Sequence, residues 1–213
     1  MKPTNANAPQ WFVLSAVYGR ELKLLEFLLE RGFQAFVPKH QVVRHDAYGK
    51  KRRTLEPVVK NWVFVRAEKA ELEFIKNYVL QKYNWTVCFL TKPVRVPDYS
   101  KFDPTRPDRK VRMIEKKQII TISDEEMAPF IRICEEMADE IIYFTPEEVD
   151  LSKGDRVRII GGTFDGMEGH FIKVTGKRNR RFVVTIPQML MASTANIEPK
   201  FIKIIEKAAK KKP

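Results

Sequence analysis

A run of cations gives this chain its clearest means of binding a ligand. The cluster consists of Lys50, Lys51, Arg52 and Arg53, with Arg44 and His45 on the other side of the turn-forming sequence DAYG. Lysine and arginine on a protruding turn attract phosphates without reading base sequence, and Tyr48 or His45 can stack on a base. The pattern predicts an electrostatic hold on single-stranded nucleic acid. The alternative is a solvated hairpin end.

Residue types that carry catalysis or bind metals are present but poorly placed. His40, His45 and His170 are scattered, with no cysteine or carboxylate pair at zinc-ligand spacing. Ser15 and Ser152 have no general base in view. We therefore expect no catalysis, no cofactor and no metal. An enzyme acting on nucleic acid is kept as an alternative, which a divalent-metal requirement would favour.

Composition indicates a folded protein that works near polyanions. The 213 residues carry a net charge of +12, which favours nucleic acid or ribonucleoprotein surroundings. No apolar run approaches the roughly 20 residues of a membrane-spanning helix. The first ten residues, MKPTNANAPQ, lack the apolar core of a signal peptide, so we expect a cytoplasmic protein. Cys88 and Cys134 lie in apolar stretches and are predicted to be buried and reduced.

The elements that must position the cations begin with a strand, a helix and a second strand. WFVLSAV at 11–17 is an apolar, β-branched run typical of a buried strand. A helix follows over 21–32, and Gly32 is placed to end it. Its apolar face consists of Leu22, Leu25 and Leu29, widened by Leu24, Phe27 and Leu28. Extended structure resumes at FQAFVP, residues 33–38.

A long hairpin is predicted from residue 39 onward, with the cations at its tip. The run NWVFVRA, 61–67, follows as a central strand, then a helix to about residue 81 and the strand WTVCFL. Residues 91–112 hold four prolines and many charges, which predicts an unpacked excursion. Ser123 and Glu126 then form a capping box that begins another helix.

In the last third of the chain, apolar and polar residues alternate within short segments, a pattern typical of β-strands. Glycines and turns separate five such segments within about 55 residues, which indicates a small barrel. The residues predicted to point inward are Val157, Ile159, Ile172, Val174, Phe182, Val184 and Ile186. A glycine-rich loop after the first strand needs the positive φ angles that glycine adopts. Its sequence does not continue as a phosphate-binding loop.

The segment LSKGDRVRIIGGTFDGMEG resembles the KOW motif of small SH3-like barrels in transcription and ribosomal proteins. The matching positions are Gly154, Asp155, Val157, Ile159, Gly162, Phe164, Gly166 and Gly169. A KOW-type RNA-binding or ribosome-associated protein is therefore one reading of the chain. In that reading, the basic turn of Lys177, Arg178, Arg180 and Arg181 would contact RNA; a solvated turn is the alternative.

The first residues of the chain favour a different kind of KOW-containing protein over a ribosome-associated one. WFVLSAVYGRE resembles the W-[YF]-V-x-x-x-x-x-G-x-E opening of the NusG N-terminal domain; Trp11, Phe12, Gly19 and Glu21 are in register. EPVVKNWVFVR resembles the family stretch P-L-F-P-G-Y-[VL]-F-V, with Trp62 and Phe64 at its two later aromatic positions. Val59, Lys60 and Asn61 replace its Phe-Pro-Gly. The proline-rich excursion and ISDEEMAPFIRI are most similar to UpxY antiterminators.

The resemblance implies a two-part fold. Its first part is an α+β N-terminal domain of the NusG type, an antiparallel sheet flanked by helices, and its second is an all-β SH3-like KOW barrel. The expected divisions are a disordered arm at 1–9, the N-terminal domain at 10–144, a linker at 145–150, the barrel at 151–206 and a basic tail at 207–213.

The resemblance also implies a function in transcription elongation or antitermination. Aromatic side chains of the first domain would dock on the clamp helices of the RNA polymerase β′ subunit. The carried-over contacts are Trp62, Phe64 and Phe89, with Trp11 and Phe12 beside them. The basic hairpin would hold the non-template DNA strand, and the barrel would recruit a ribosomal protein or another factor. We expect a monomer with no membrane association.

Overall fold

The structure is a computed structural model of the whole chain. It describes residues 8–45, 47–101, 112–137, 141–145, 148–151, 154–173, 180–187, 189–193, 197 and 199–207. Several predicted features lie outside these residues: residues 1–7 of the arm expected at 1–9, residues 208–213 of the tail expected at 207–213, and Ser152, Val174, Lys177 and Arg178.

The chain divides into two compact units that are not continuous in sequence. The first comprises Met1–Ala35 and Asn61–Thr121, and the second comprises Phe36–Lys60 and Ile122–Pro213. This division differs from the expected one, because the basic hairpin and the third helix belong with the C-terminal strands.

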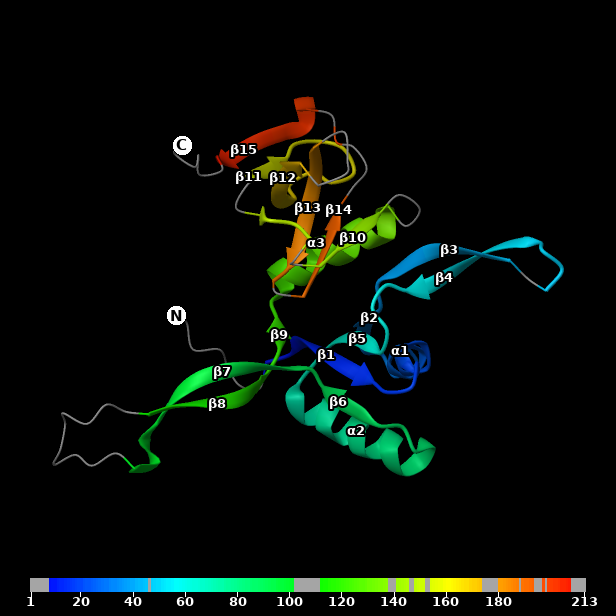
Figure 1. The fold of residues 1–213 in the computed structure, drawn as a ribbon, viewed down its shortest axis with the longest axis vertical. Coiled ribbons are helices and arrows are strands. Elements are labelled where there is room, and N and C mark those ends of the chain that lie inside the picture. The colour runs from blue at the N-terminus through cyan, green and yellow to red at the C-terminus, as the bar shows by residue number, and fades with distance from the viewer. Residues whose placement is uncertain are drawn as a thin grey trace. The chain divides into compact units, whose positions relative to one another are not determined.

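The first unit is built around a sheet with the order β2-β5-β1-β6, and β9 pairs with β1 off this path. Strand β1 is antiparallel to both β5 and β6. Its strands are β1 (Gln10–Ala16), β2 (Gln34–Phe36), β5 (Trp62–Ala67), β6 (Val87–Phe89) and β9 (Thr121–Ile122). Two of the three unit boundaries fall inside strands, one in β2 and one in β9, and the third lies just before β5. The predicted central place of β5 is confirmed, since it lies between β2 and β1 (Figure 1).

Two helices pack on this sheet. Helix α1 (Glu21–Leu29) contacts β1 and β5, and α2 (Lys69–Tyr83) contacts β6. The buried stripe of α1 is Leu24, Phe27 and Leu28, which were predicted to widen the apolar face. The predicted centre of that face was wrong at Leu22 and Leu29, which are 40% and 52% exposed. Gly32 has a φ of +78°, as its helix-ending position predicted.

The proline-rich excursion begins and ends as an ordered hairpin. Strand β7 (Thr91–Asp98) pairs along its whole length with β8 (Arg112–Ile119), and a 3₁₀ turn, η1 (Tyr99–Lys101), follows β7 (Figure 1). Pro93 and Pro97 fit within β7 because a two-stranded ribbon leaves one edge of each strand without a ladder partner. Most of its residues are exposed, so the segment extends from the sheet without adding to the core.

In the second unit, strands β3 (Lys39–His45) and β4 (Lys51–Pro57) form the predicted basic hairpin. Helix α3 (Asp124–Glu136) begins at Ser123 with both hydrogen bonds of the predicted capping box. It packs on β13 and β14, and buries Met127, Phe130 and Ile133.

The C-terminal strands form a six-stranded antiparallel sheet in the order β10-β14-β13-β12-β11-β15. They are β10 (Ile142–Phe144), β11 (Asp155–Ile159), β12 (Glu168–Lys173), β13 (Arg180–Ile186), β14 (Leu190–Ser193) and β15 (Ile202–Glu206); η3 (Pro199–Phe201) precedes the last. Five were predicted. The described residues of the predicted inward set are buried: Val157, Ile159, Ile172, Phe182, Val184 and Ile186.

The sixth strand, β10, lies at the end of the expected N-terminal domain. It pairs with β14, and Phe144 and Val149 enter the apolar core cluster formed with Ile172, Val183 and Met191. The described part of the expected 145–150 linker is therefore anchored by Val149, whose side chain is 5% exposed.

The two cysteines differ in environment. Cys134 is buried, as predicted, but Cys88 is exposed and that prediction was wrong. Cys88 sits in β6, a strand of three residues at an end of the sheet order, so its outward face is uncovered. Within the described ranges, no helix is long and apolar enough to cross a membrane, and no group of three or more potential metal ligands gathers.

Candidate nucleic-acid interface

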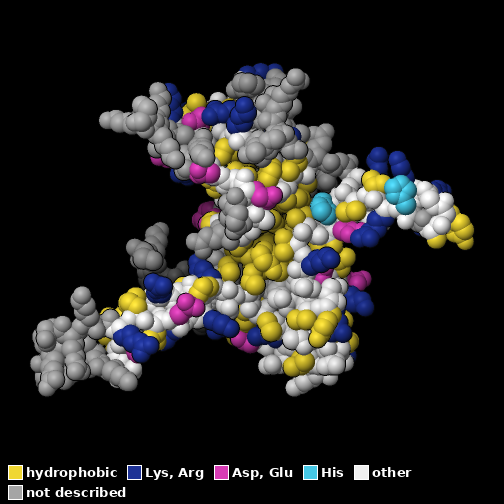
Figure 2. Space-filling model, viewed as in Figure 1, with side chains coloured by type: hydrophobic (Ala, Val, Ile, Leu, Met, Phe, Trp, Pro, Cys, Tyr) yellow, Lys and Arg dark blue, Asp and Glu magenta, His cyan; other side chains and the backbone are white. Residues whose placement is uncertain are grey.

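The β3–β4 register divides the predicted cations between two faces of the hairpin. Lys51 lies opposite His45 and Arg53 opposite Val43, so these side chains share one face. Arg52 lies opposite Arg44 on the other face. All the described cations of the cluster are exposed, and dark-blue and cyan side chains mark this hairpin in the space-filling view (Figure 2). The structure thus brings the predicted residues together on a thin ribbon accessible from both sides.

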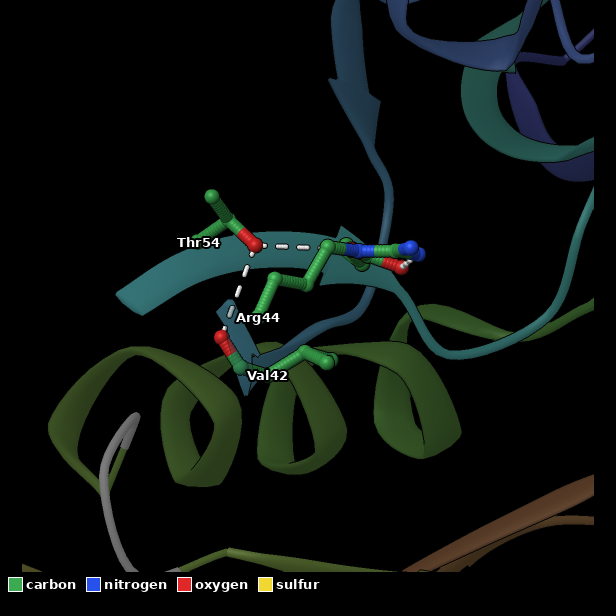
Figure 3. Close-up of polar contacts among 4 residues, drawn as sticks. Val42, Arg44 and Thr54 are labelled. Atoms are coloured by element: carbon green, nitrogen blue, oxygen red, sulfur yellow. Dashed lines mark hydrogen bonds and ion pairs between the residues drawn. The ribbon is translucent and has the colours of Figure 1, made fainter. Parts of the chain in front are cut away.

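Arg44 is held by a carboxylate on the neighbouring strand. Its Nη2 donates to Oε2 of Glu56 at 2.8 Å, and its Nε donates to Oε1 of the same side chain (Figure 3). Thr54 lies beside this pair, with its Oγ1 3.4 Å from Oε1 of Glu56 and 3.5 Å from the carbonyl of Val42. The hydrogen bond from Arg44 lowers the pKa of Glu56, and the pKa of Arg44 is raised in return. Arg44 therefore commits two guanidinium donors within the hairpin.

Exposed apolar side chains accompany the cations; apolar positions in the hairpin arms were predicted from the sequence, but their exposure was not. Val43 is 53% and Leu55 is 54% exposed, and both lie on the face that carries Lys51 and Arg53. The alternation of side chains along a strand places Val43 and Leu55 on one face. Their exposure follows only when it is known that nothing packs on that face of the hairpin. Tyr48 at the turn is 96% exposed. One face thus combines cations with apolar surface, which suits a ligand with phosphates and flat bases.

The five predicted aromatic contacts do not form one surface. Trp62, Phe64 and Trp11 point to one side of the first sheet, as their pairing with β1 and β5 neighbours requires. Phe12 and Phe89 point to the other side, where their ring centres are 5.5 Å apart. Lys76 of α2 lies over the Phe89 ring, so that side is the one facing α2.

Burial removes three of these residues from the predicted contact set. Phe64 has no exposed surface, and Trp11 and Phe12 are 7% and 4% exposed. The physical reason is the central position of β5 and β1, which places their side chains in the core on both faces of the sheet. Trp62 and Phe89 remain half-buried. Trp62 of β5 pairs with Ser15 of β1, and Ser15 pairs on its other side with the exposed Cys88 of β6. These three residues therefore form one row across the strands on this side of the sheet.

Asn61 stands where the NusG stretch P-L-F-P-G-Y-[VL]-F-V has its glycine. Its φ is +68°, a left-handed conformation that asparagine tolerates better than most residues. Its side-chain Oδ1 accepts the N–H of Gly19 at 2.9 Å, and its carbonyl accepts the N–H of Ala16 at 2.7 Å. Asn61 thereby joins the start of β5 to the end of β1 and sets the position of Trp62.

The glycine-rich motif forms a tight loop between β11 and β12. Gly161, Gly162 and Gly166 all have positive φ, and the N–H of Gly166 donates to the carbonyl of Ile159 at 2.9 Å. A Cβ on Gly169 would lie 2.6 Å from the carbonyl oxygen of Val183, so only glycine fits there. Gly161, Gly162 and Gly166 therefore shape this loop, whereas Gly169 allows β12 to approach β13 closely.

Two carboxylates of the second sheet pair with three of its arginines. Glu168 receives hydrogen bonds from Arg156, at 3.0 Å, and from Arg158, which hold its pKa below the ordinary value. Arg180, one of the predicted RNA-contact residues, donates to Asp155 at 3.0 Å.

Helices packed on a sheet in the first unit, followed by a six-stranded antiparallel sheet in the second, define an α+β protein. Residues 9–131, more than half of the chain, match the sequence model of a family described as "Transcription termination factor nusG". The chain belongs to the NusG family of transcription factors. No curated protein matches it.

Proposed function

We propose that this protein is a transcription elongation and antitermination factor of the UpxY type, acting in the cytoplasm without enzymatic activity. Its first unit binds the β′ clamp helices of RNA polymerase, the β3–β4 hairpin holds the non-template DNA strand, and the C-terminal sheet acts as a KOW barrel that engages a further factor. The observation that carries the proposal is the family match over residues 9–131, joined to an exposed hairpin rich in cations.

Trp62 is the side chain that best supports polymerase binding. It keeps exposed surface while its neighbours on β5 are buried, and Asn61 holds the strand start on which it sits. Large aromatic side chains supply most of the energy at interface centres. The row from Trp62 through Ser15 to Cys88 is therefore our candidate contact line.

The hairpin supports a second, electrostatic contact. Its described cations are exposed on both faces, so a strand passing along either face meets positive charge. A factor that binds clamp helices and DNA together favours the closed, elongating polymerase, because its affinity for that state is the greater. Reduced pausing and termination follow from this shift.

Binding to purified polymerase core and to a clamp-helix fragment tests the proposal. We expect both to bind, and expect Trp62→Ala to cost about 2 kcal/mol, roughly a 30-fold loss of affinity. Trp85→Ala is the matched control, since Trp85 is a half-buried tryptophan that stacks on Tyr83. Failure of the wild-type chain to bind either target would overturn the proposal. RNA binding without polymerase would favour the ribosome-associated reading.

Transcription past a terminator, with and without the protein, tests the outcome of binding. Read-through should rise with the wild-type chain. It should fall when the hairpin cations Lys50, Lys51, Arg52 and Arg53 are all replaced by glutamine. Equal read-through by that variant would remove the hairpin from the mechanism.

A further inference from the structure

The ribbon formed by β7 and β8 is a second basic element of this chain, and the proposed function gives it no role. Its two strands pair along their whole length. Two carboxylates, Asp98 and Glu115, lie in these strands. Dark-blue side chains are visible along this arm in the space-filling view (Figure 2). The cations of the two strands are all exposed: Lys92, Arg95, Arg112, Lys116 and Lys117.

The sheet of the first unit holds the base of the ribbon. The N–H of Leu90, just before β7, donates to the carbonyl of Val13 in β1 at 2.8 Å. The N–H of Ile120, just after β8, donates to the carbonyl of Leu90 at 3.0 Å. The chain is thus hydrogen-bonded both where it leaves the sheet and where it returns, so the ribbon is anchored at its base.

The strand register places two lysines on one face of the ribbon. Lys92 of β7 lies opposite Gln118, and Lys116 of β8 lies opposite Val94. Because alternate residues of a strand share a face, both lysines lie on the same side, which we name the lysine face. Neither lysine has a carboxylate directly opposite it in the register.

The other face is partly neutralised within the ribbon. Arg95 lies directly opposite Glu115, while Lys117 lies opposite Pro93. Opposite charges at such a position attract each other across the strands, so the charge of Arg95 is partly offset by the ribbon itself.

The lysine face carries one carboxylate, at its far end. Asp98 lies opposite Arg112, and its Oδ1 accepts the N–H of Ser100 at 3.0 Å. The hydrogen bonds from Ser100, with Lys116 and Arg112 nearby, hold the pKa of Asp98 below its ordinary value. Asp98 is therefore ionised at neutral pH and offsets Arg112. Lys92 and Lys116 remain as the cations that this face offers to a ligand.

Branched apolar side chains lie along the lysine face. Val94, Val96 and Ile114 are half-buried there, and Val96 lies directly opposite Ile114. Their methyl groups form a low strip, with one lysine contributed by each strand. Apolar side chains of this kind make contact with the methyl group that thymine presents in the major groove.

Shape and composition select among the polyanions that could bind the ribbon. Two strands about 4.8 Å apart form a ribbon that the major groove of B-DNA, about 12 Å wide, can admit. The major groove of double-stranded RNA is too narrow for side chains to read. A single strand is held largely by aromatic stacking, and neither β7 nor β8 contains an aromatic residue. Duplex DNA is therefore the best match.

We propose that the β7–β8 ribbon binds double-stranded DNA by placing its lysine face in the major groove, with Lys92 and Lys116 on phosphates. The strands are each eight residues long. At about 3.3 Å per residue they extend over about 26 Å, roughly the length of eight base pairs. This contact goes beyond the proposed function, which places only the β3–β4 hairpin on DNA.

Binding of the full chain to a short DNA duplex, with no polymerase present, tests the ribbon. The variant with glutamine at positions 50–53 serves as background, so that the β3–β4 hairpin contributes little. It should bind the duplex. Replacing Lys92 and Lys116 with glutamine should lower the slope of log affinity against log salt by about 1.8, since each phosphate contact contributes about 0.9.

The matched control removes the same charge from the other face. Arg95 and Lys117 are also exposed, and replacing both with glutamine should leave the slope unchanged. An equal loss of slope in the two double variants would overturn the assignment of the lysine face to DNA. Circular dichroism of both variants should match the background protein, because the replaced side chains lie outside the core.

A chemical footprint and labelled methyl groups locate the contact. Dimethyl sulfate methylates guanine N7 in the major groove and adenine N3 in the minor groove, so saturating protein should protect the first and not the second. The methyl signal of Ile114 should shift when duplex is added. That of Met113, 53% exposed on the other face, should not.

Several results would overturn the proposal. They are protection of adenine N3 alone, tighter binding of a double-stranded RNA or of a single DNA strand of the same sequence, and no binding of the duplex. Binding to polyglutamate in place of the duplex would instead assign the ribbon to an acidic protein. Because polymerase is absent, none of these results bears on the clamp-helix experiment.

Discussion

Arg44 on β3 donates two hydrogen bonds to the Glu56 carboxylate on β4, one of them 2.8 Å long. Both residues lie on the same face of the hairpin, and Thr54 lies between them along the strand. The pair links the two strands of the hairpin expected to contact DNA and sets how much charge that face presents.

The Arg44–Glu56 pair makes the hairpin sensitive to acid. The pKa of Glu56 lies below its ordinary value of 4.5, chiefly because of the hydrogen bond from Arg44. The stabilisation that the ionised Glu56 carboxylate gives the hairpin is therefore fully present above pH 4.5. It is lost as the pH falls through the lowered pKa of Glu56. A carboxyl NMR titration should show a lower midpoint for Glu56 in the wild type than in Arg44→Gln. Equal midpoints would contradict the pairing.

Glu56→Gln should strengthen DNA binding by the hairpin. The change removes a negative charge and weakens the hold on Arg44, leaving its guanidinium able to reach a phosphate. One added contact steepens the slope of log affinity against log salt by about 0.7 for a single strand. Anisotropy measurements across a salt series check this. Glu206→Gln on β15, an exposed carboxylate, makes the same charge change and should leave the slope unaltered.

Gly169→Ala should destabilise the second sheet. The new Cβ would lie 2.6 Å from the Val183 carbonyl oxygen and 2.8 Å from Cε2 of Phe182, a fully buried ring. Overpacking of this kind typically costs about 1–3 kcal/mol. Urea unfolding measures the loss, and the exposed Thr163→Ala, in the same loop region, should stay within about 0.5 kcal/mol. Similar stabilities for the two variants would show that the site can relax.

The two cysteines should differ sharply in reactivity. Burial raises the pKa of Cys134 to about 12, so at pH 8 it stays a protonated, shielded thiol. Cys88 is exposed and free. Ellman's reagent should modify one thiol quickly in the native protein and both in denaturant. Cys88→Ser should remove the fast phase; loss of that phase in Cys134→Ser instead would reverse the assignment.

Asn61 should tolerate glycine better than alanine. Alanine at a φ of +68° adds backbone strain of about 1–2 kcal/mol and also loses the hydrogen bond to Gly19. Glycine keeps the backbone conformation and loses only that bond, worth about 1 kcal/mol. Urea unfolding of both variants gives the comparison. Equal destabilisation would mean that the backbone angle at this position is not a constraint.

Much of the fold was readable from short-range patterns. The capping box of Ser123 and Glu126, the helix-ending Gly32 and the strands of both sheets depend on neighbouring residues, whose spacing is visible in the chain. The basic hairpin was predicted for the same reason, since its turn and cations are contiguous.

Only the tertiary structure decided which side chains on a given face are exposed and which are buried. Alternation showed that Trp62 and Phe64 share a face of β5, but it could not show that the core covers Phe64 and leaves part of Trp62 open. The Arg44–Glu56 pair likewise joins residues whose meeting depends on strand register. Spacing along a chain determines which side chains share a face. Only the packing of other elements against that face determines what can touch it.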